Sequence, residues 1–228
     1  MDTMPIFQAI GILKGKITQS QSDEYRFLIE INNVSYEIKT YHTSKCTREK
    51  LIKHIQENTS PARIMVYPRL KIDPDTAKQK VKFSLANFIT TEDNSKLVGI
   101  LSDNEFILRG IYKKVAGFKD PCITVFKNKD KRNELLFEKH LSKGKTKYFL
   151  PMNIPVKWKD AVITPYDARD SEIQQKYFVS LKAKFSAKKS TFTYHSLLDA
   201  PTNEIPQAIF VEPEQDLKTE ETYIMSNF

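Results

Sequence analysis

Glycine and cysteine are scarce in this chain of 228 residues, and each shortage argues against one class of site. Six glycines leave little material for the Gly-rich turns that wrap nucleotide phosphates. The two cysteines, Cys46 and Cys122, are far apart and form no Cys-x-x-Cys pair. Free thiols in a reducing compartment fit this usage better than a disulfide framework, so we expect a cytoplasmic protein.

Long apolar runs are also missing. No stretch of about 18 apolar residues is present, so no membrane-spanning helix and no membrane partner are expected. The first residues, MDTMPIFQAIG, lack the basic segment followed by an apolar stretch that marks a secretory signal.

Catalytic signatures are absent as well. The segment SKGKTK at 142–147 resembles a phosphate loop, but the position that needs a further glycine is Lys139. Asp73 and Asp75 flank Pro74 as ordinary turn residues. The histidines show no ligand spacing; they are His42, His54, His140 and His195. We therefore predict no cofactor, no metal and no catalysis, with an enzyme of unrecognised site as the remaining alternative.

Charge is divided unevenly along the chain. The net charge is +8, but residues 199–228 hold seven acids against one base, which gives −6 there and +14 over the rest. A basic body with an acidic tail favours a polyanionic partner. The alternative is that the excess charge only keeps the protein soluble.

The first half of the chain alternates as β-strands do. We predict strands at 6–18, 25–31, 34–41, 63–70 and 80–88, with Asn32-Asn33 as a hairpin turn. Between the third and fourth strands the period changes, and a helix is expected from Ser44, with Thr47 as a possible cap. Three strands, a helix and two strands is the pattern of the OB-fold, a five-stranded Greek-key barrel, in which Gly11 or Gly15 would bend the first strand. An unrelated small barrel or an α+β sheet is the alternative.

The second half contains similar landmarks, which favours a tandem duplication. Residues 7–14 match 106–113 at an offset of 99, MVYP at 65–68 matches VITP at 162–165, and Ser84-Leu85 matches Ser180-Leu181. We therefore predict a mainly β fold with two OB-like five-stranded barrels in tandem. The expected divisions are 1–92, 100–198 and an acidic, extended tail at 199–228. The strands of the second copy would lie near 105–116, 121–128, 134–138, 147–150, 159–166 and 176–186.

Alternation also nominates residues for the binding face of each barrel, where bases stack on aromatic rings and Lys or Arg side chains contact phosphates. In the first copy these are Arg26, Lys39, Tyr41, Arg69 and Lys71. In the second copy they are Arg109, Lys113, Phe126, Lys127, Lys182, Lys184, Lys188 and Lys189. Exposed lysines also discourage aggregation of strand edges, which is the alternative explanation for any one of them.

The body of the chain, about 180 residues, resembles tandem OB-fold proteins of the single-strand-binding type in its fold pattern. The resemblance implies a non-catalytic protein that binds single-stranded DNA or RNA through a basic groove with aromatic stacking. The segment 214–228, EQDLKTEETYIMSNF, is similar to the acidic tail with a terminal Phe by which bacterial single-strand-binding proteins recruit partners, but it lacks their dense acids before Phe228. A protein–protein interaction or assembly module built on the same barrels is the alternative function.

Overall fold

The computed structural model describes residues 5–57, 60–72, 79–90, 95–142 and 149–211. Strands account for 48% of the chain and helices for 18%, so the predicted mainly β class is confirmed. None of the described helices is long and apolar enough to cross a membrane.

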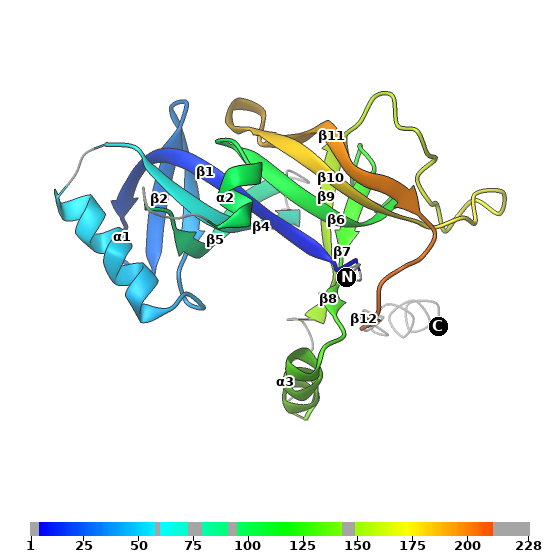
Figure 1. The fold of residues 1–228 in the computed structure, drawn as a ribbon, viewed down its shortest axis with the longest axis horizontal. Coiled ribbons are helices and arrows are strands. Elements are labelled where there is room, and N and C mark those ends of the chain that lie inside the picture. Colours follow the sequence, from blue (N-terminus) through cyan, green and yellow to red (C-terminus); the bar gives the residue numbers. More distant parts are fainter. Residues whose placement is uncertain (1–4, 58–59, 73–78, 91–94, 143–148, 212–228) are drawn as a thin grey trace, which may run out of the picture.

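The first half forms a closed five-stranded barrel, which we call the first barrel (Figure 1). Its strands are β1 (Gln8–Gln19), β2 (Arg26–Ile31), β3 (Val34–Lys39), β4 (Ala62–Ile72) and β5 (Gln79–Phe88). They pair in the order β1, β2, β3, β5, β4, and β4 pairs back with β1. All neighbours are antiparallel except β3 and β5, which are parallel. The helix α1 (Lys45–Glu57) follows β3 in the chain and precedes β4.

Local sequence explains these elements. Phe27, Ile29 and Ile31 alternate with exposed residues on β2 and fill the barrel interior. Asn32 and Asn33 both have positive φ, as the two central residues of a tight hairpin require. The side chain of Ser44, rather than the expected Thr47, caps α1 by accepting a hydrogen bond from the Thr47 amide at 3.1 Å.

The second half contains five strands with the same cyclic pairing, which we call the second ring. They are β6 (Glu105–Lys113), β7 (Cys122–Val125), β9 (Met152–Lys157), β10 (Tyr177–Ser186) and β11 (Thr191–Thr202). Their order is β6, β7, β9, β11, β10, and β10 pairs back with β6. Again one pair, β9 with β11, is parallel. The remaining elements are α2 (Lys96–Ile100), β8 (Lys127–Asn128), α3 (Lys131–Leu141), the 3-10 turn η2 (Ala187–Lys189) and β12 (Ala208–Ile209).

Several strands predicted for the second copy are wrong. Residues 134–138 lie inside α3, whose N-terminus is capped by the Asp130 side chain, and 159–166 form a loop with one isolated bridge at Tyr166. Of the strand predicted at 147–150, only Phe149 and Leu150 are described, and neither is in a strand. The strand β11 was not predicted, and its last residues, together with β12, lie in the range expected to be tail.

The register of the two sets of strands identifies corresponding residues. Gly15 in the first barrel and Gly110 in the second ring occupy equivalent positions. A Cβ atom at Gly15 would lie 2.3 Å from the Glu30 carbonyl oxygen on the next strand, and one at Gly110 would lie 2.4 Å from that of Thr124. Starting from these glycines and moving from each residue to its partner on the next strand gives four more pairs of equivalent residues. They are Ala62 and Val179, Pro68 and Phe185, Phe83 and Phe192, and Ile38 and Val156.

These pairs show that the alignment proposed from sequence is wrong. The glycines are 95 residues apart, not 99, and the corresponding strands β4 and β10 are 117 apart, because β8 and α3 are inserted between β7 and β9. Residues 162–165 lie in no strand, and Ser180-Leu181 lie on β10, which corresponds to β4 rather than to the β5 strand of Ser84-Leu85.

The two halves share one core and one sheet. The N-terminal part of β1 pairs with β6, which joins all ten strands into a continuous sheet. Phe83 of the first barrel packs on Phe106 of β6 and Phe185 of β10, with ring centroids 6.0 and 5.4 Å apart. The buried Tyr36 hydroxyl also crosses the junction and donates to the Ala187 carbonyl oxygen. Because these apolar residues belong to one cluster, the halves cannot separate without exposing it.

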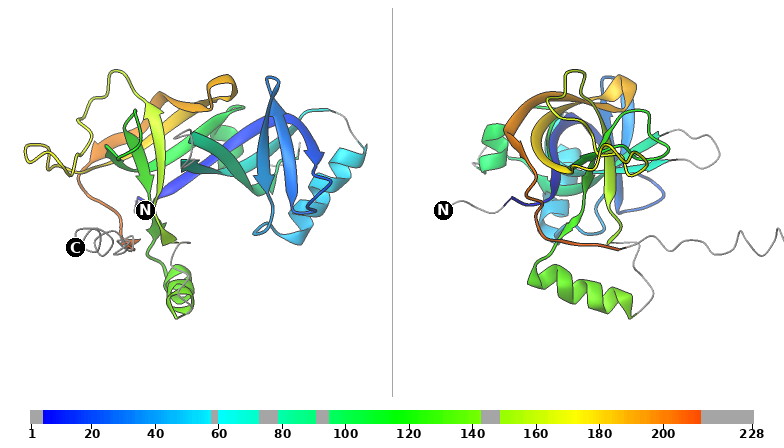
Figure 2. Two further views of the ribbon diagram at one scale, coloured as in Figure 1. Left: turned by 180° about the vertical axis from the view of Figure 1, so that it is seen from behind. Right: turned by 90° about the vertical axis from the view of Figure 1, so that its right-hand side faces the viewer.

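The ends of the described chain meet beside β8. The backbone of Phe7 exchanges two hydrogen bonds with the Asn128 side chain, and Ala208 on β12 pairs with the same asparagine. From this point α3 projects away from the strands in every view (Figures 1 and 2).

Candidate nucleic-acid interface

The outer face of β2, β3, β5 and β4 gathers basic side chains from four neighbouring strands. One row of strand partners crosses the sheet from β2 to β4. In it Arg26 lies opposite Lys39, Lys39 lies beside Ser84, and Ser84 lies opposite Tyr67. Farther along β4 and β5, the next pair of partners whose side chains face outward is Arg69 and Lys82, and the pair after that is Lys71 and Lys80. Four nominated residues are therefore brought onto one face, since alternate residues of neighbouring strands point to the same side. They are Arg26, Lys39, Arg69 and Lys71.

Sequence reasoning missed two further cations on this face, Lys80 and Lys82. Both belong to β5, where the alternation of Val81, Phe83 and Leu85 on the buried side already placed them outside. They were overlooked because the usual binding face of such barrels is centred on the second and third strands. In this barrel β5 lies directly beside β3, so its lysines extend the same face.

One carboxylate, Glu37, sits among these cations. Lys82 donates to it at 2.6 Å and Lys39 lies 3.6 Å away. Partial burial opposes ionisation of Glu37, but the hydrogen bond from Lys82 and the charges of Lys82, Lys39 and Arg26 outweigh it and hold its pKa below the usual value. The carboxylate thus remains ionised because the surrounding potential is positive.

Tyr41 forms an exposed aromatic platform at one end of this face. Its ring stacks on Tyr25 with centroids 5.2 Å apart, and the guanidinium of Arg48 lies 4.6 Å from the centre of the Tyr25 ring. The Tyr41 hydroxyl donates to Asp23, which also pairs with Arg26 at 2.9 Å. Tyr41 is nevertheless 47% exposed, so the outer side of a fixed ring is open to solvent. Tyr67, on β4, is 43% exposed.

We define the cationic face as Arg26, Lys39, Arg69, Lys71, Lys80 and Lys82 with the rings of Tyr41 and Tyr67. No protein-family model, curated protein or solved structure matches the chain. Within the part of the chain that the structure describes, no group of three His, Cys, Asp or Glu side chains could hold a metal ion.

The residues nominated around β6 and β8 do not form a similar face. Arg109 is half-buried and its Nε donates to the Ser180 hydroxyl at 3.1 Å. Lys113 is half-buried, and burial lowers the pKa of its amine, with the charge of Lys176 adding to the effect. Phe126 packs against Phe7 at 5.3 Å between ring centroids and is therefore part of a small core. Lys127 belongs to β8, where it pairs with Ile209.

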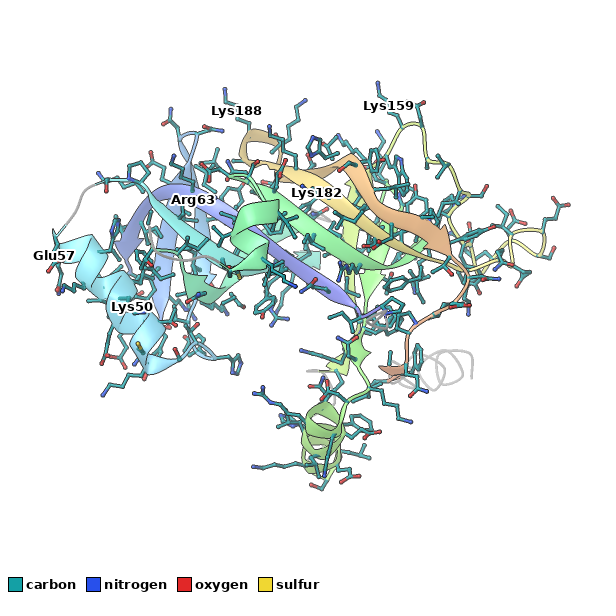
Figure 3. The ribbon with its side chains drawn as sticks, in the orientation of Figure 1. Lys50, Glu57, Arg63, Lys159, Lys182 and Lys188 are labelled. Carbon is teal, nitrogen blue, oxygen red and sulfur yellow. The ribbon has the colours of Figure 1, made fainter. Side chains whose placement is uncertain are left out.

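The residues nominated on β10 and η2 divide into two groups. Lys182 points toward the junction and donates to the Ile100 carbonyl oxygen at 2.7 Å. Lys184, Lys188 and Lys189 are exposed near the tip of the β10–β11 hairpin. Figure 3 shows Lys188 extending outward from this tip. Of the lysines predicted at 182–189, Lys182 is thus bound within the protein, and the others are exposed to solvent.

Proposed function

We propose that the chain is a tandem of two OB-type barrels. The first barrel is consistent with that fold in its strand order, in the parallel pairing of its third and fifth strands, and in the helix that precedes its fourth strand. The second ring supports the duplication, because its pairings repeat those of the first barrel position by position. Proposed divisions near 1–92 and 100–198 would then be halves of one body.

The function that this geometry supports best is binding of single-stranded nucleic acid. The observation that carries the proposal is the cationic face, where six Lys and Arg side chains lie on adjoining strands and are bordered by the exposed rings of Tyr41 and Tyr67. Three of these cations, Lys82, Lys39 and Arg26, act on Glu37. Cations spaced along a sheet track a phosphate backbone, and an exposed ring accepts an unpaired base. Inside a duplex both faces of a base are covered by the neighbouring base pairs, so a single strand is favoured over a duplex.

A fluorescence anisotropy titration against matched single-stranded and duplex oligonucleotides tests the proposal. We expect tighter binding of the single strand and an affinity that falls steeply as salt is raised. The double variant Arg69→Ala/Lys71→Ala should reduce the slope of log affinity against log salt by about 1.4, since each lost phosphate contact on a single strand removes about 0.7.

The matched control removes the same charge elsewhere. Lys50 and Lys53 are exposed on α1, which contributes no residue to the cationic face, and Lys50→Ala/Lys53→Ala should leave the slope unchanged. Figure 3 shows Lys50 on this helix. Absence of binding by the unmodified protein even at low salt would remove the proposal.

A second candidate function, a protein interaction module, is favoured by the insertion around α3. Leu135 and Leu141 on this helix are 60% and 55% exposed, and Phe210 beyond β12 is 62% exposed. Exposed apolar side chains on a projecting element are typical of a contact site. Purification with a stoichiometric protein and without nucleic acid would favour this function. The partner recruitment suggested for residues 214–228 concerns a segment outside the described residues.

A further inference from the structure

The two halves are related by an approximate two-fold axis at their junction. In the β1–β6 ladder, Gly11 is the partner of Phe106. These two residues also correspond to each other, since both lie four positions before the corresponding glycines Gly15 and Gly110. An antiparallel ladder centred on corresponding residues has the symmetry of an isologous contact, in which each half meets the other in the same way.

The aromatic core of the junction is centred on Phe106, the partner of Gly11 in this ladder. Phe83 and Phe192 correspond to each other, and both pack on Phe106, with ring centroids 6.0 and 5.1 Å apart. The two ends of the ladder also correspond. At one end Lys14 forms an ion pair with Asp103 at 3.4 Å, and at the other end the matching residues, Arg109 and Gln8, are strand partners. The two halves are therefore arranged head to head, as two copies in a dimer would be.

A two-fold axis has a consequence for a nucleic-acid strand, because such a strand has a chemical direction. A strand that crosses the first barrel in one direction would meet the corresponding face of the second ring reversed. Its bases and phosphates would then have to contact the second face differently. The same strand cannot use both faces in the same way.

The corresponding face of the second ring has indeed lost its aromatic platform. Tyr67 corresponds to Lys184, and two residues beyond Lys157, at the position that corresponds to Tyr41, the chain has Lys159. Lys39 corresponds to Lys157 and Lys71 to Lys188, so cations remain at these places. Figure 3 shows Lys159 and Lys188 both extending from the same edge of the molecule.

The centre of this second face is also closed. Cys122 corresponds to Leu28, which is 42% exposed, yet Cys122 is fully buried. Thr124 is fully buried too, and its hydroxyl donates to the Asn153 side chain at 2.8 Å. The exposed cations lie at the margins: Lys157 at the end of β9, and Lys184 and Lys188 along the β10–β11 hairpin. Lysines bind phosphates as point charges and supply no surface on which a base could stack.

We propose, resting on the proposed function, that unpaired bases bind only at the first barrel and that the second ring contacts only the sugar–phosphate backbone of the same ligand. The protein would then hold a single strand by its bases at one end and by its phosphates at the other. Its ligand is a single strand long enough to cross both halves.

The test compares an oligonucleotide of thymidines with an abasic oligonucleotide of the same length, which keeps the phosphates and lacks the bases. Tyr41→Ala should weaken binding of the thymidine strand by about 5- to 160-fold, the usual effect of losing one stacked base, and leave binding of the abasic strand unchanged. Tyr41→Phe keeps the ring and should restore most of the affinity. The triple variant Lys157→Ala/Lys184→Ala/Lys188→Ala should weaken binding of both strands by the same factor.

Each outcome bears on a different statement. If the unmodified protein binds neither strand at low salt, the proposed function fails. If it binds both but the lysine variant weakens only the thymidine strand, or Tyr41→Ala weakens both strands equally, the division between bases and backbone is wrong while nucleic-acid binding stands. Circular dichroism of each variant establishes that it is folded.

Discussion

At the scale of single residues, alternation predicted which side chains face outward but not what covers them. Arg26 and Arg69 are exposed and Lys39 is partly exposed, as their alternation along β2, β3 and β4 predicted. Phe126 alternates equally well, yet Phe7 and Phe210 cover its ring. Such covering segments come from distant parts of the sequence, so a local pattern carries no signal for them. The stacked pair of Tyr25 and Tyr41 likewise depends on the β2–β3 hairpin bringing the two residues together.

Asp167 shows how a single carboxylate fixes a loop. It lies in the loop between β9 and β10 and accepts hydrogen bonds from the backbone and side chain of Arg169, while Lys114 lies 3.5 Å away. The hydrogen bonds from the Arg169 side chain and backbone lower the pKa of Asp167 to about 2, with smaller contributions from the charge of Arg169 and a hydrogen bond from Lys114 that together outweigh the opposing effect of burial. The adjacent Tyr166 binds the end of β6 through backbone hydrogen bonds, so Asp167 helps attach the loop to the second ring.

A pH dependence of stability follows from this shift. The pKa of Asp167 is lower in the folded state than in the unfolded chain, so its contribution is complete above about pH 4 and is lost as the pH falls toward 2. Asp167→Asn should therefore lower the melting temperature at pH 7, and the difference from the unmodified protein should shrink between pH 4 and pH 2. Thermal denaturation followed by circular dichroism across this range measures it. Asp160→Asn, an exposed change in the same loop, is the control, and a difference that is constant with pH would contradict the prediction.

At the scale of elements, the strands of the first half were predicted well because β2, β3 and β5 alternate and the β2–β3 turn carries the expected asparagines. The second half was predicted poorly for two reasons. The apolar run Leu135-Leu136-Phe137 was interpreted as a strand, although Asp130 three residues before Asn133 is a usable helix-start signal. The strand β11 was missed because the assumed alignment placed the last strand of the repeat on β10, and the alternation of Phe192 and Tyr194 was left without a role.

Glycines mark where the first strand of each half approaches its neighbour. At Gly110 a Cβ atom would lie 2.4 Å from the Thr124 carbonyl oxygen and 2.9 Å from the Ile123 side chain. Gly110→Ala should therefore force β6 and β7 apart and lower the free energy of unfolding by about 3 kcal/mol. Urea denaturation measures the change.

Gly99 supplies the matched control. No atom lies within 4 Å of a Cβ built at Gly99, which is exposed on α2. Gly99→Ala should be neutral or stabilising by up to about 1 kcal/mol, because alanine favours a helix more than glycine does. Equal effects of the two substitutions would show that the close approach at Gly110 is of no importance.

At the scale of the whole molecule, the sequence led to the proposal of two tandem barrels but gave no sign of how the two halves are joined. The symmetric ladder and the shared aromatic cluster depend on pairing between β1 and β6, which are separated by most of the first barrel. A pair of independent barrels on a linker would have fitted the sequence equally well. Instead, Phe83 and Tyr36 pack on residues of the other half, so we expect the entire body to form one cooperative unit.

Unfolding should accordingly occur in one transition. Calorimetry of the full chain is expected to show a single peak, and the fragment 1–92 should fail to fold, because it would leave Tyr36, Phe83 and the N-terminal part of β1 without their partners. Two resolved peaks, or a sigmoidal urea transition of the isolated fragment, would contradict this expectation.

The meeting of Phe7 and Ala208 on Asn128 also determines how the chain could be rewired. A short peptide bridging the two ends would disturb little, and new ends could be opened in the crossing between β5 and α2. A circularly permuted protein made in this way would keep every ladder of the ten-stranded sheet intact. Ile89 and Leu97, on either side of the opening, belong to one cluster with Ile10 and Ile107 at the junction, so paired fluorophores attached near them could report how the halves respond to a bound strand.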